Sequence, residues 1–436
     1  MPIFSFSSLI VIATALIVGI ILLFYRPLIQ ASWWRAIITP LASIMGSGFL
    51  VCAPLLYSSI GNYAVWAMAA LLVLAFGVGS VIRFNIRYGD PLFRKKNGNI
   101  SGAQNHRLHV AYCNSSSHIC WAGAIGSLEK FSHVILIAAY CISVSYYLQL
   151  LASFTLHNIV NGYPLIGKIL VTLILAGIGI IGTTRGLKGI ERVERIVVGI
   201  NLAMITALLA GLVYYNLHAM NAGVWELSSL PITDTPIHLT RVVMGMLIVV
   251  QGFETSRFLG SEHSADERIH TMRWAQLIST VIYLLFLSLM ALVMSKNDLG
   301  NERGITAIIS LSGTVSVVLP LLLTLTAVGS QFSAATADDA GGAGLLEAII
   351  GDIIPKRYNY LIISGASVAL TWLTNVYEII SYASRAFALF YALQCALALL
   401  IIRNSQERRL SNKRMALYAI LGVFCLAVSI LGIPAE

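Results

Sequence analysis

Long apolar segments recur along the whole 436-residue chain, and they limit its fold more than any other feature. A helix needs roughly 20 apolar residues to cross a bilayer, and such stretches extend from residues 6–25 to residues 415–433. Charged residues make up only 11% of the chain, which excludes a soluble enzyme, a secreted disulfide scaffold and a disordered protein. A transmembrane β-barrel would show short alternating segments instead. We therefore predict an all-α, multi-pass membrane protein.

About twelve spans are expected in the cell (inner) membrane, with both termini outside the cytoplasm. No basic residue precedes the first span, unlike in a cleaved signal peptide. Lys and Arg gather in alternate gaps between spans, and the basic side of a membrane protein is normally cytoplasmic. This topology accounts for the excess of 28 basic over 19 acidic residues, so no nucleic acid partner is expected. The expected spans are 6–25, 36–58, 61–82, 130–155, 164–182, 195–216, 238–259, 272–294, 305–333, 359–375, 378–402 and 415–433.

Two of these spans carry glycines close to mid-membrane: Gly46 and Gly48 in the second span and Gly252 in the seventh. Backbone released from a helix inside a bilayer must find partners in protein, water or ligand. Paired interruptions in two halves of a chain point to a transporter binding site, whereas single small residues also serve close helix packing. We expect an interruption in each of these spans.

The positions of the interruptions divide the chain into two halves of five spans each. Because five is odd, the second half must run inverted relative to the first. We therefore expect a five-plus-five inverted repeat with one extra helix at each end. The expected parts are 1–35 (extra helix and linker), 36–216 (first repeat, core helices 1–5), 238–403 (second repeat, core helices 6–10) and 404–436 (extra helix).

The motifs at the interruptions resemble those of the amino acid/polyamine/organocation permease superfamily, whose members have the LeuT-type inverted-repeat fold. Gly46-Ser47-Gly48-Phe49 is similar to the glycine motif of its first core helix, and Gly252-Phe253-Glu254 to the unwound part of its sixth. The stretch 379–403 resembles its tenth core helix. The segment 337–342, where we expect core helix 8 to end, departs from the amino acid permeases, and this places the chain in a divergent branch.

The resemblance implies that backbone groups at the two interruptions bind the carboxylate and amine of a substrate, with Phe253 as an aromatic gate. Ordinary helix packing is the alternative role of Phe253. In core helix 3, Tyr140 is a further candidate because a phenol near mid-membrane can donate to a substrate or to a freed carbonyl. The expected substrate-binding residues are Gly46, Ser47, Gly48, Tyr140, Gln251, Gly252 and Phe253.

Charged residues inside a membrane are costly and are candidates for function. Glu254 and Arg257 lie three residues apart and can pair with each other. Arg385 is expected to bind a substrate carboxylate, or to pair with Glu254 or Glu378 as a gate. A fixed structural ion pair is the alternative. Glu254 and Arg385 are therefore our gate or coupling candidates.

Core helix 8 carries hydroxyls at a spacing that resembles the sodium site of sodium-coupled members of this fold: Ser330, Ser333 and Thr336. Oxygen ligands suit a hard cation, although serine and threonine also pack helices together. Asp338 and Asp339 are an alternative route for protons. Sodium is the one candidate cofactor, and no other is expected.

The sequence thus predicts a secondary active transporter of an amino acid or related small organic solute, working by alternating access and driven by a sodium or proton gradient. A non-transporting membrane receptor is the alternative. An enzyme is not expected, because no nucleophile–base pair, P-loop or zinc-protease motif is found. A metal-ion transporter would be expected to carry acids at 44–49, and that segment has none. The expected partners are the substrate, membrane lipid and, as an open alternative, a second copy of the chain.

Overall fold

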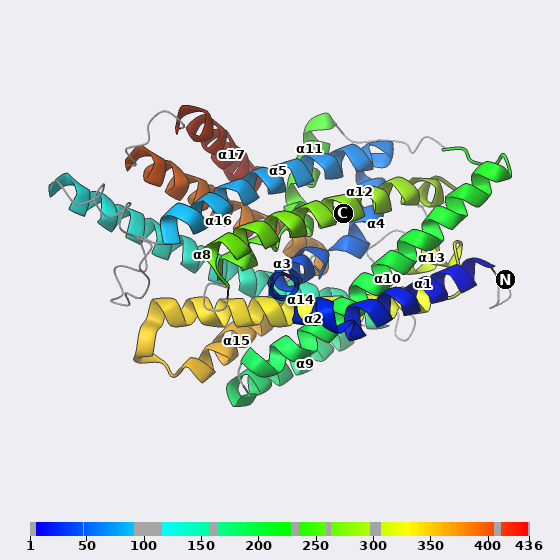
Figure 1. The fold of residues 1–436 in the computed structure, drawn as a ribbon, viewed down its shortest axis with the longest axis horizontal. Coiled ribbons are helices and arrows are strands. Elements are labelled where there is room, and N and C mark those ends of the chain that lie inside the picture. The colour runs from blue at the N-terminus through cyan, green and yellow to red at the C-terminus, as the bar shows by residue number, and fades with distance from the viewer. Residues whose placement is uncertain are drawn as a thin grey trace.

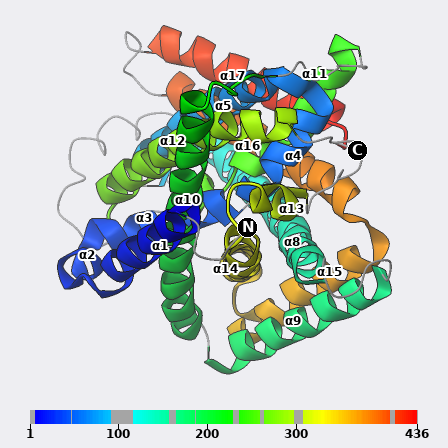
Figure 2. The same ribbon diagram turned by 90° about the vertical axis from the view of Figure 1, so that its right-hand side faces the viewer.

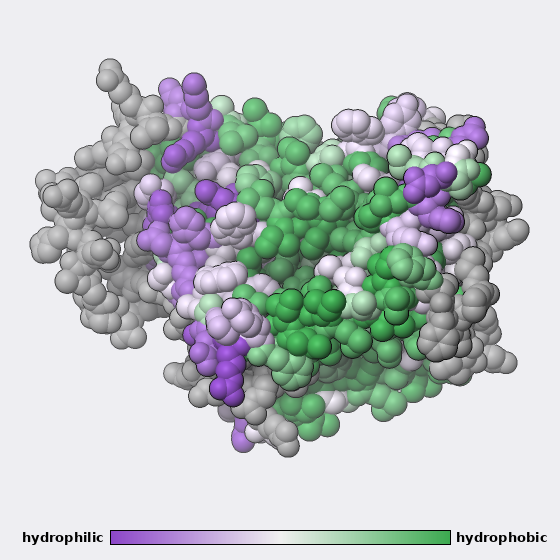
Figure 3. Space-filling view, turned by 45° about the vertical axis from the view of Figure 1, so that its right-hand side comes forward, coloured by the Kyte–Doolittle hydropathy of each residue, from purple (hydrophilic) through white to green (hydrophobic). Residues whose placement is uncertain are grey.

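The structure is a computed structural model, and every regular element that it describes is helical. Most helices run side by side along the longest axis of the molecule (Figure 1). Figure 3 shows a broad hydrophobic band with a larger group of hydrophilic residues toward one end and a smaller group toward the other. The predicted class, an all-α multi-pass membrane protein, is confirmed. The described residues are 6–46, 48–90, 116–156, 164–185, 187–227, 235–258, 263–296, 307–404 and 411–434.

The extra N-terminal helix, α1 (Phe6–Phe24), packs along α10 (Leu187–Asn221). A Cβ on Gly199 would lie 2.8 Å from the Leu23 side chain, and one on Gly211 would lie 2.9 Å from Val11. Small residues allow helices to approach closely in a membrane. The glycines of α10 therefore hold α1 against the bundle, while the opposite face of α1 is exposed.

The first half begins after the short connecting helix α2 (Arg26–Gln30). Its long helix α8 (Ser116–Leu156) lies near the middle of Figure 2, beside α14 (Leu319–Ile350) of the second half. The elements of the first half are α3 (Ser32–Gly46) with α4 (Phe49–Ile60), η1 (Gly61–Tyr63), α5 (Ala64–Phe84) with the π-turn η2 (Asn85–Gly89), α8 (Ser116–Leu156), α9 (Pro164–Arg185) and α10.

The second half begins at α11 (Pro236–Gly245) and is followed by one further helix, α17 (Ser411–Leu431). Its other elements are η4 (Leu247–Val250), η5 (Phe253–Phe258), α12 (Ala265–Lys296), α13 (Ala307–Gly313), α14 (Leu319–Ile350), η6 (Gly351–Ile353), η7 (Lys356–Tyr358), α15 (Asn359–Leu373) and α16 (Val376–Asn404).

Core helix 8 has different bounds from those predicted: the span 305–333 is wrong. The short helix α13 is separate, and α14 starts afresh with Pro320 in its first turn, where a proline is tolerated. Gly341 and Gly342 do not end α14. A Cβ on Gly341 would lie 3.2 Å from the ring of Tyr140, and one on Gly342 would lie 3.3 Å from Ile363. These glycines therefore let α8 and α15 approach α14. Asp338 therefore lies inside the helix rather than at its end.

Nine helices within the described ranges are long and apolar enough to cross a membrane. One of the nine segments runs from Ser32 to Gly89 and contains two predicted spans. The 15-residue α15 falls short of the length required, and core helix 6 is divided into α11, η4 and η5. These three cases account for the difference from the twelve predicted spans.

Equivalent helix pairs recur in the two predicted halves. α8 packs on α9 as α14 packs on α15, and α8 packs on α16 as α14 packs on α10. In the same way, α5 packs on α16 as α12 packs on α10. Inverted repeats have this property because equivalent helices have equivalent neighbours. The five-plus-five arrangement and its boundaries stay a prediction, which these pairs favour.

Candidate functional site

Core helix 1 is interrupted between Gly46, where α3 ends, and Phe49, where α4 begins. Gly48 has φ of 148°, a value that residues with a Cβ rarely adopt. Gly46 brings α3 against α14, because a Cβ there would lie 2.7 Å from the Cβ of Ala334. Ser47, also predicted to belong to the site, lies outside the described residues.

Core helix 6 is interrupted at Gln251 and Gly252, as the sequence predicts. α11 ends at Gly245, and the chain continues as the 3₁₀ turns η4 and η5 on either side of the interruption. Gln251 is extended, with ψ of 174°, and Gly252 has φ of 114°. Short 3₁₀ stretches in place of an α-helix often mark a functional hinge.

At Gly252 the interruption in core helix 6 meets core helix 1, in the last turn of α3 before that helix is interrupted. A Cβ on this residue would lie 2.6 Å from the carbonyl carbon of Ser43 and 2.7 Å from the nitrogen of Ile44. No side chain fits between two backbones at such distances. The interrupted parts of core helices 1 and 6 therefore form one site.

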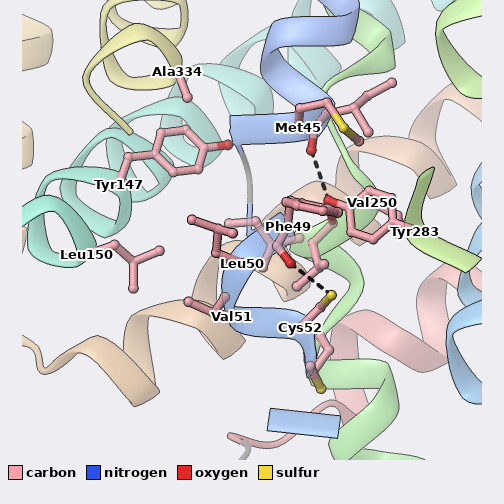
Figure 4. Packing of buried hydrophobic residues seen from close by; sticks show 14 of the residues in the cluster. Met45, Phe49, Leu50, Val51, Cys52, Tyr147, Leu150, Val250, Tyr283 and Ala334 are labelled. Carbon is pink, nitrogen blue, oxygen red and sulfur yellow. Dashed lines mark hydrogen bonds between the residues drawn. The ribbon is translucent and has the colours of Figure 1, made fainter. Parts of the chain in front are cut away.

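Tyr283 of α12 joins the two interrupted helices and was missed by reasoning from the sequence. Its hydroxyl lies 3.0 Å from the carbonyl oxygen of Ile44 and 2.6 Å from that of Val249, and its one hydrogen is shared between these two acceptors. Figure 4 shows Tyr283 on one side of the interruption in core helix 1 and Tyr147 on the other. Carbonyls released from a helix need such donors inside a membrane. A tyrosine in the middle of an apolar span is the one signal that the sequence offers.

Glu254 is fully buried and turns back onto the interruption. One carboxylate oxygen, Oε2, accepts a hydrogen bond from the backbone N–H of Gly252 at 3.0 Å and another from the hydroxyl of Tyr391 at 2.8 Å. The ring of Phe253 stacks on that of Tyr391, with 5.3 Å between centroids. Phe253 is fully buried and lies against an aromatic partner beside the site; its role as a gate stays a prediction.

The tyrosines of α8 form the opposite wall. Gln251 donates to the hydroxyl of Tyr147 at 2.5 Å. One turn before Tyr147, Ser143 donates to a carboxylate oxygen of Asp338 in α14. Tyr140 is buried, its ring meets that of Phe387 edge-on, and its hydroxyl has no hydrogen-bond partner among the described residues. Gln251 thus joins the interruption in core helix 6 to α8, and substrate binding by Tyr140 and Gln251 stays a prediction.

The hydroxyls of the candidate sodium site are buried in the middle of α14. Ser330 and Thr336 donate to backbone carbonyls three residues earlier, at 3.1 and 2.9 Å. The hydroxyl of Ser333 has no partner within the described part of the chain. A Cβ on Gly46 would lie 3.1 Å from the carbonyl oxygen of Ser330, so this face of α14 adjoins the end of α3. Sodium binding there stays a prediction.

Two expected ion pairs are replaced by other contacts. Arg257 pairs with Glu129 at 2.7 Å instead of with Glu254, whose carboxylate is taken by Gly252 and Tyr391. Arg385 donates from Nε to the backbone carbonyl of Ser429 in α17 at 2.8 Å. The sequence could not show that this side of α16 faces α17.

Below the site, Arg257 belongs to a buried ionic network. It contacts Asp90 as well as Glu129, with 3.5 Å to the nearer oxygen of Asp90, and it donates to the amide oxygen of Gln394. Arg268 contacts Asp90 at 3.1 Å and the backbone carbonyl of Arg257 at 2.6 Å. The network ties η5 to α8, α12 and α16 and to the end of η2, at the end of the bundle that we predict to be cytoplasmic.

Comparison with known proteins gives a family and a fold. The profile of a family described as "APC superfamily transporter" matches residues 26–432. An uncharacterized protein of Aquifex aeolicus (strain VF5) is 37% identical over 390 residues, which cover 89% of each chain.

Solved structures of an Eremococcus coleocola manganese transporter are also similar. The complex with an aromatic bis-isothiourea compound has a TM-score of 0.55 at 11% identity and covers 93% of this chain and 86% of that one. A variant of the same transporter has a TM-score of 0.54 at 12% identity, covering 92% and 87%. At such identities the likeness concerns the fold alone.

Proposed function

The chain belongs to the APC superfamily of transporters, and from this premise we propose that it is a secondary active transporter of an amino acid or related small organic solute. It would work by alternating access around the site between the interrupted core helices 1 and 6. We place it in the cell (inner) membrane with both termini outside, following the distribution of Lys and Arg.

The observation that carries this proposal is the contact between Gly252, at the interruption of core helix 6, and the last turn of α3, with Tyr283 joined to both helices. A membrane anchor needs no interrupted helix, because unwound backbone is tolerated only where protein, water or ligand satisfies it. Interrupted helices that meet near mid-membrane in two halves of a chain are typical of transporter binding sites.

We propose that a sodium or proton gradient drives transport. The hydroxyls of Ser330, Ser333 and Thr336 beside the end of α3 support sodium, since oxygen atoms are the ligands of hard cations. The carboxylates of Asp338 and Asp339 support protons. In some proton-coupled relatives a lysine of core helix 5 takes the place of the sodium ion. The segment 196–221 of α10 contains no lysine, which favours sodium over protons.

Manganese is not proposed as a substrate, although the similar solved structures are those of a manganese transporter. The segment 44–49 of core helix 1 contains no acidic residue, and a hard divalent cation needs several oxygen ligands.

The test is uptake into liposomes that contain the purified protein, with a sodium gradient or a pH gradient imposed and labelled amino acids and amines supplied. We expect gradient-driven uptake above that of empty liposomes. Gly252→Leu should abolish uptake, whereas Gly365→Leu, at a position with nothing within 4 Å of a Cβ, should retain it. Binding of a ligand without uptake would favour the receptor instead.

A further inference from the structure

In core helix 6 the protein itself occupies backbone groups to which the resemblance assigns a substrate carboxylate. The freed N–H of Gly252 donates to the carboxylate of Glu254, and that of Ile248 donates to the hydroxyl of Ser384 at 2.9 Å. A substrate carboxylate at Gly252 would have to displace Glu254 and lie beside its negative charge. Like charges at close range repel strongly in a site of low dielectric.

The site is also negatively charged in its surroundings. Glu254 is fully buried, and the hydrogen-bond donors described for it are neutral: a backbone N–H and the phenol of Tyr391. Asp338, which accepts a hydrogen bond from Ser143, is a second buried carboxylate. The ring of Phe387 contacts both Tyr140 and Tyr391, the phenol that donates to Glu254. Tyr140 lies one turn before Ser143, the donor to Asp338.

Arg257, the basic residue nearest to Glu254 in the sequence, does not neutralise the charge of Glu254. Arg257 is held by Glu129 and Asp90 in the network below the site. A buried carboxylate without a partner of opposite charge is costly, and a bound cation would remove that cost.

Two buried oxygen atoms in the site lack a partner within the described residues: Oε1 of Glu254 and the hydroxyl oxygen of Tyr140. Both accept hydrogen bonds, as an ammonium group requires. Aromatic rings complete the surroundings, since Phe387 contacts both Tyr140 and Tyr391, and Phe253 stacks on Tyr391. Ring faces attract organic cations.

A metal ion fits these surroundings less well. No group of three or more His, Cys, Asp or Glu side chains suited to hold a metal occurs in the described ranges. Divalent cations such as calcium take six or more oxygen ligands, whereas aromatic rings make up much of this site.

We propose that the site binds a protonated organic amine that carries no carboxylate, with Glu254 as its counter-ion and Tyr140 as a hydrogen-bond acceptor. This inference rests on the proposed function and narrows its substrate class. Asp338 supplies the second negative charge on the α14 side.

The test compares amines with the amino acids from which they differ by one carboxylate: phenethylamine with phenylalanine, isobutylamine with valine, and putrescine with ornithine. Binding to the purified full chain is measured by calorimetry and by the rise in melting temperature. We expect at least one amine to bind at least tenfold more tightly than its amino acid. Tighter binding of the amino acids, or no binding of any of the three amines, would overturn the proposal.

Glu254→Gln keeps the shape of the side chain and removes its charge. We expect it to weaken binding of the amine at least tenfold. Glu226→Gln is the matched control, because Glu226 is an exposed glutamate in the segment that follows α10; it should retain binding. Unchanged binding by a folded Glu254→Gln variant would refute the role of Glu254, and the comparison of amines with amino acids decides the substrate class even if that variant does not fold.

Uptake into liposomes separates this inference from the proposed function. Uptake of amino acids without binding of amines would overturn the inference and support the transporter. Tight binding of an amine that does not cross the membrane would support the inference and contradict the transporter.

Discussion

Replacing Gly252 by alanine tests the contact between the two interrupted helices. The added Cβ would lie 2.6 Å from the carbonyl carbon of Ser43 and 2.7 Å from the nitrogen of Ile44, whereas carbon atoms pack best at about 3.5–4.0 Å. A φ of 114° costs a residue with a Cβ about 1–3 kcal/mol. Overpacking costs about 1–3 kcal/mol more. We therefore expect the free energy of unfolding to fall by about 2–6 kcal/mol, with loss of ligand binding.

The assay is denaturant unfolding of the purified protein in detergent, followed by tryptophan fluorescence, with ligand binding measured in parallel. Gly365→Ala is the matched control. Gly365 lies inside α15 with nothing within 4 Å of a Cβ, and alanine is favoured over glycine in a helix by about 0.5–1 kcal/mol. If Gly252→Ala were as stable as the control and still bound ligand, the two backbones could not approach each other as described.

Three further substitutions test the surroundings of the site. Tyr283→Phe removes the hydroxyl whose hydrogen is shared between two carbonyls and should lower the free energy of unfolding by about 2 kcal/mol, measured by denaturant titration; an unchanged value would contradict the bridging role. Arg257→Gln and Glu129→Gln should each cost about 3–5 kcal/mol and together less than the sum, because each alone leaves a buried charge; strict additivity in a double-mutant cycle would show that the pair does not interact. Arg385→Ala should cost about 1–3 kcal/mol through its bond to a carbonyl of α17 and leave the preference between amines and carboxylates unchanged in binding assays; a selective loss of carboxylate binding would return Arg385 to the site.

The interruptions could be predicted from the sequence because the signal for them is local. Glycines at two mid-membrane positions are visible without any tertiary information, and Gly48 and Gly252 do take φ values that favour glycine. The membrane class follows from composition and from the length of the apolar segments. The glycines of α14 misled for the same local reason: at Gly341 they serve contact with Tyr140 rather than the end of a helix.

The partners of the freed backbone groups could not be predicted, because they come from distant parts of the chain. Tyr283 lies 239 residues from Ile44, and Ser384 lies 136 residues from Ile248. Tyr283 and Ser384 each contribute a single hydroxyl to an apolar span. Hydroxyls in such spans commonly serve helix packing or bond to the backbone of their own helix. Only the arrangement of the helices distinguishes the two residues that support the interruptions from the many that do not.

The charge of the site follows the same rule. The sequence marks Glu254 as an intramembrane acid and offers Arg257, three residues away, as its natural partner. Had that pair formed, the interruption would be neutral, and its freed N–H groups would be open to a substrate carboxylate. Instead, Glu129 and Asp90 hold Arg257, and Glu254 turns back to Gly252. The sign of the charge that the site presents to a substrate is therefore decided by two carboxylates outside it, on α8 and beyond the end of η2.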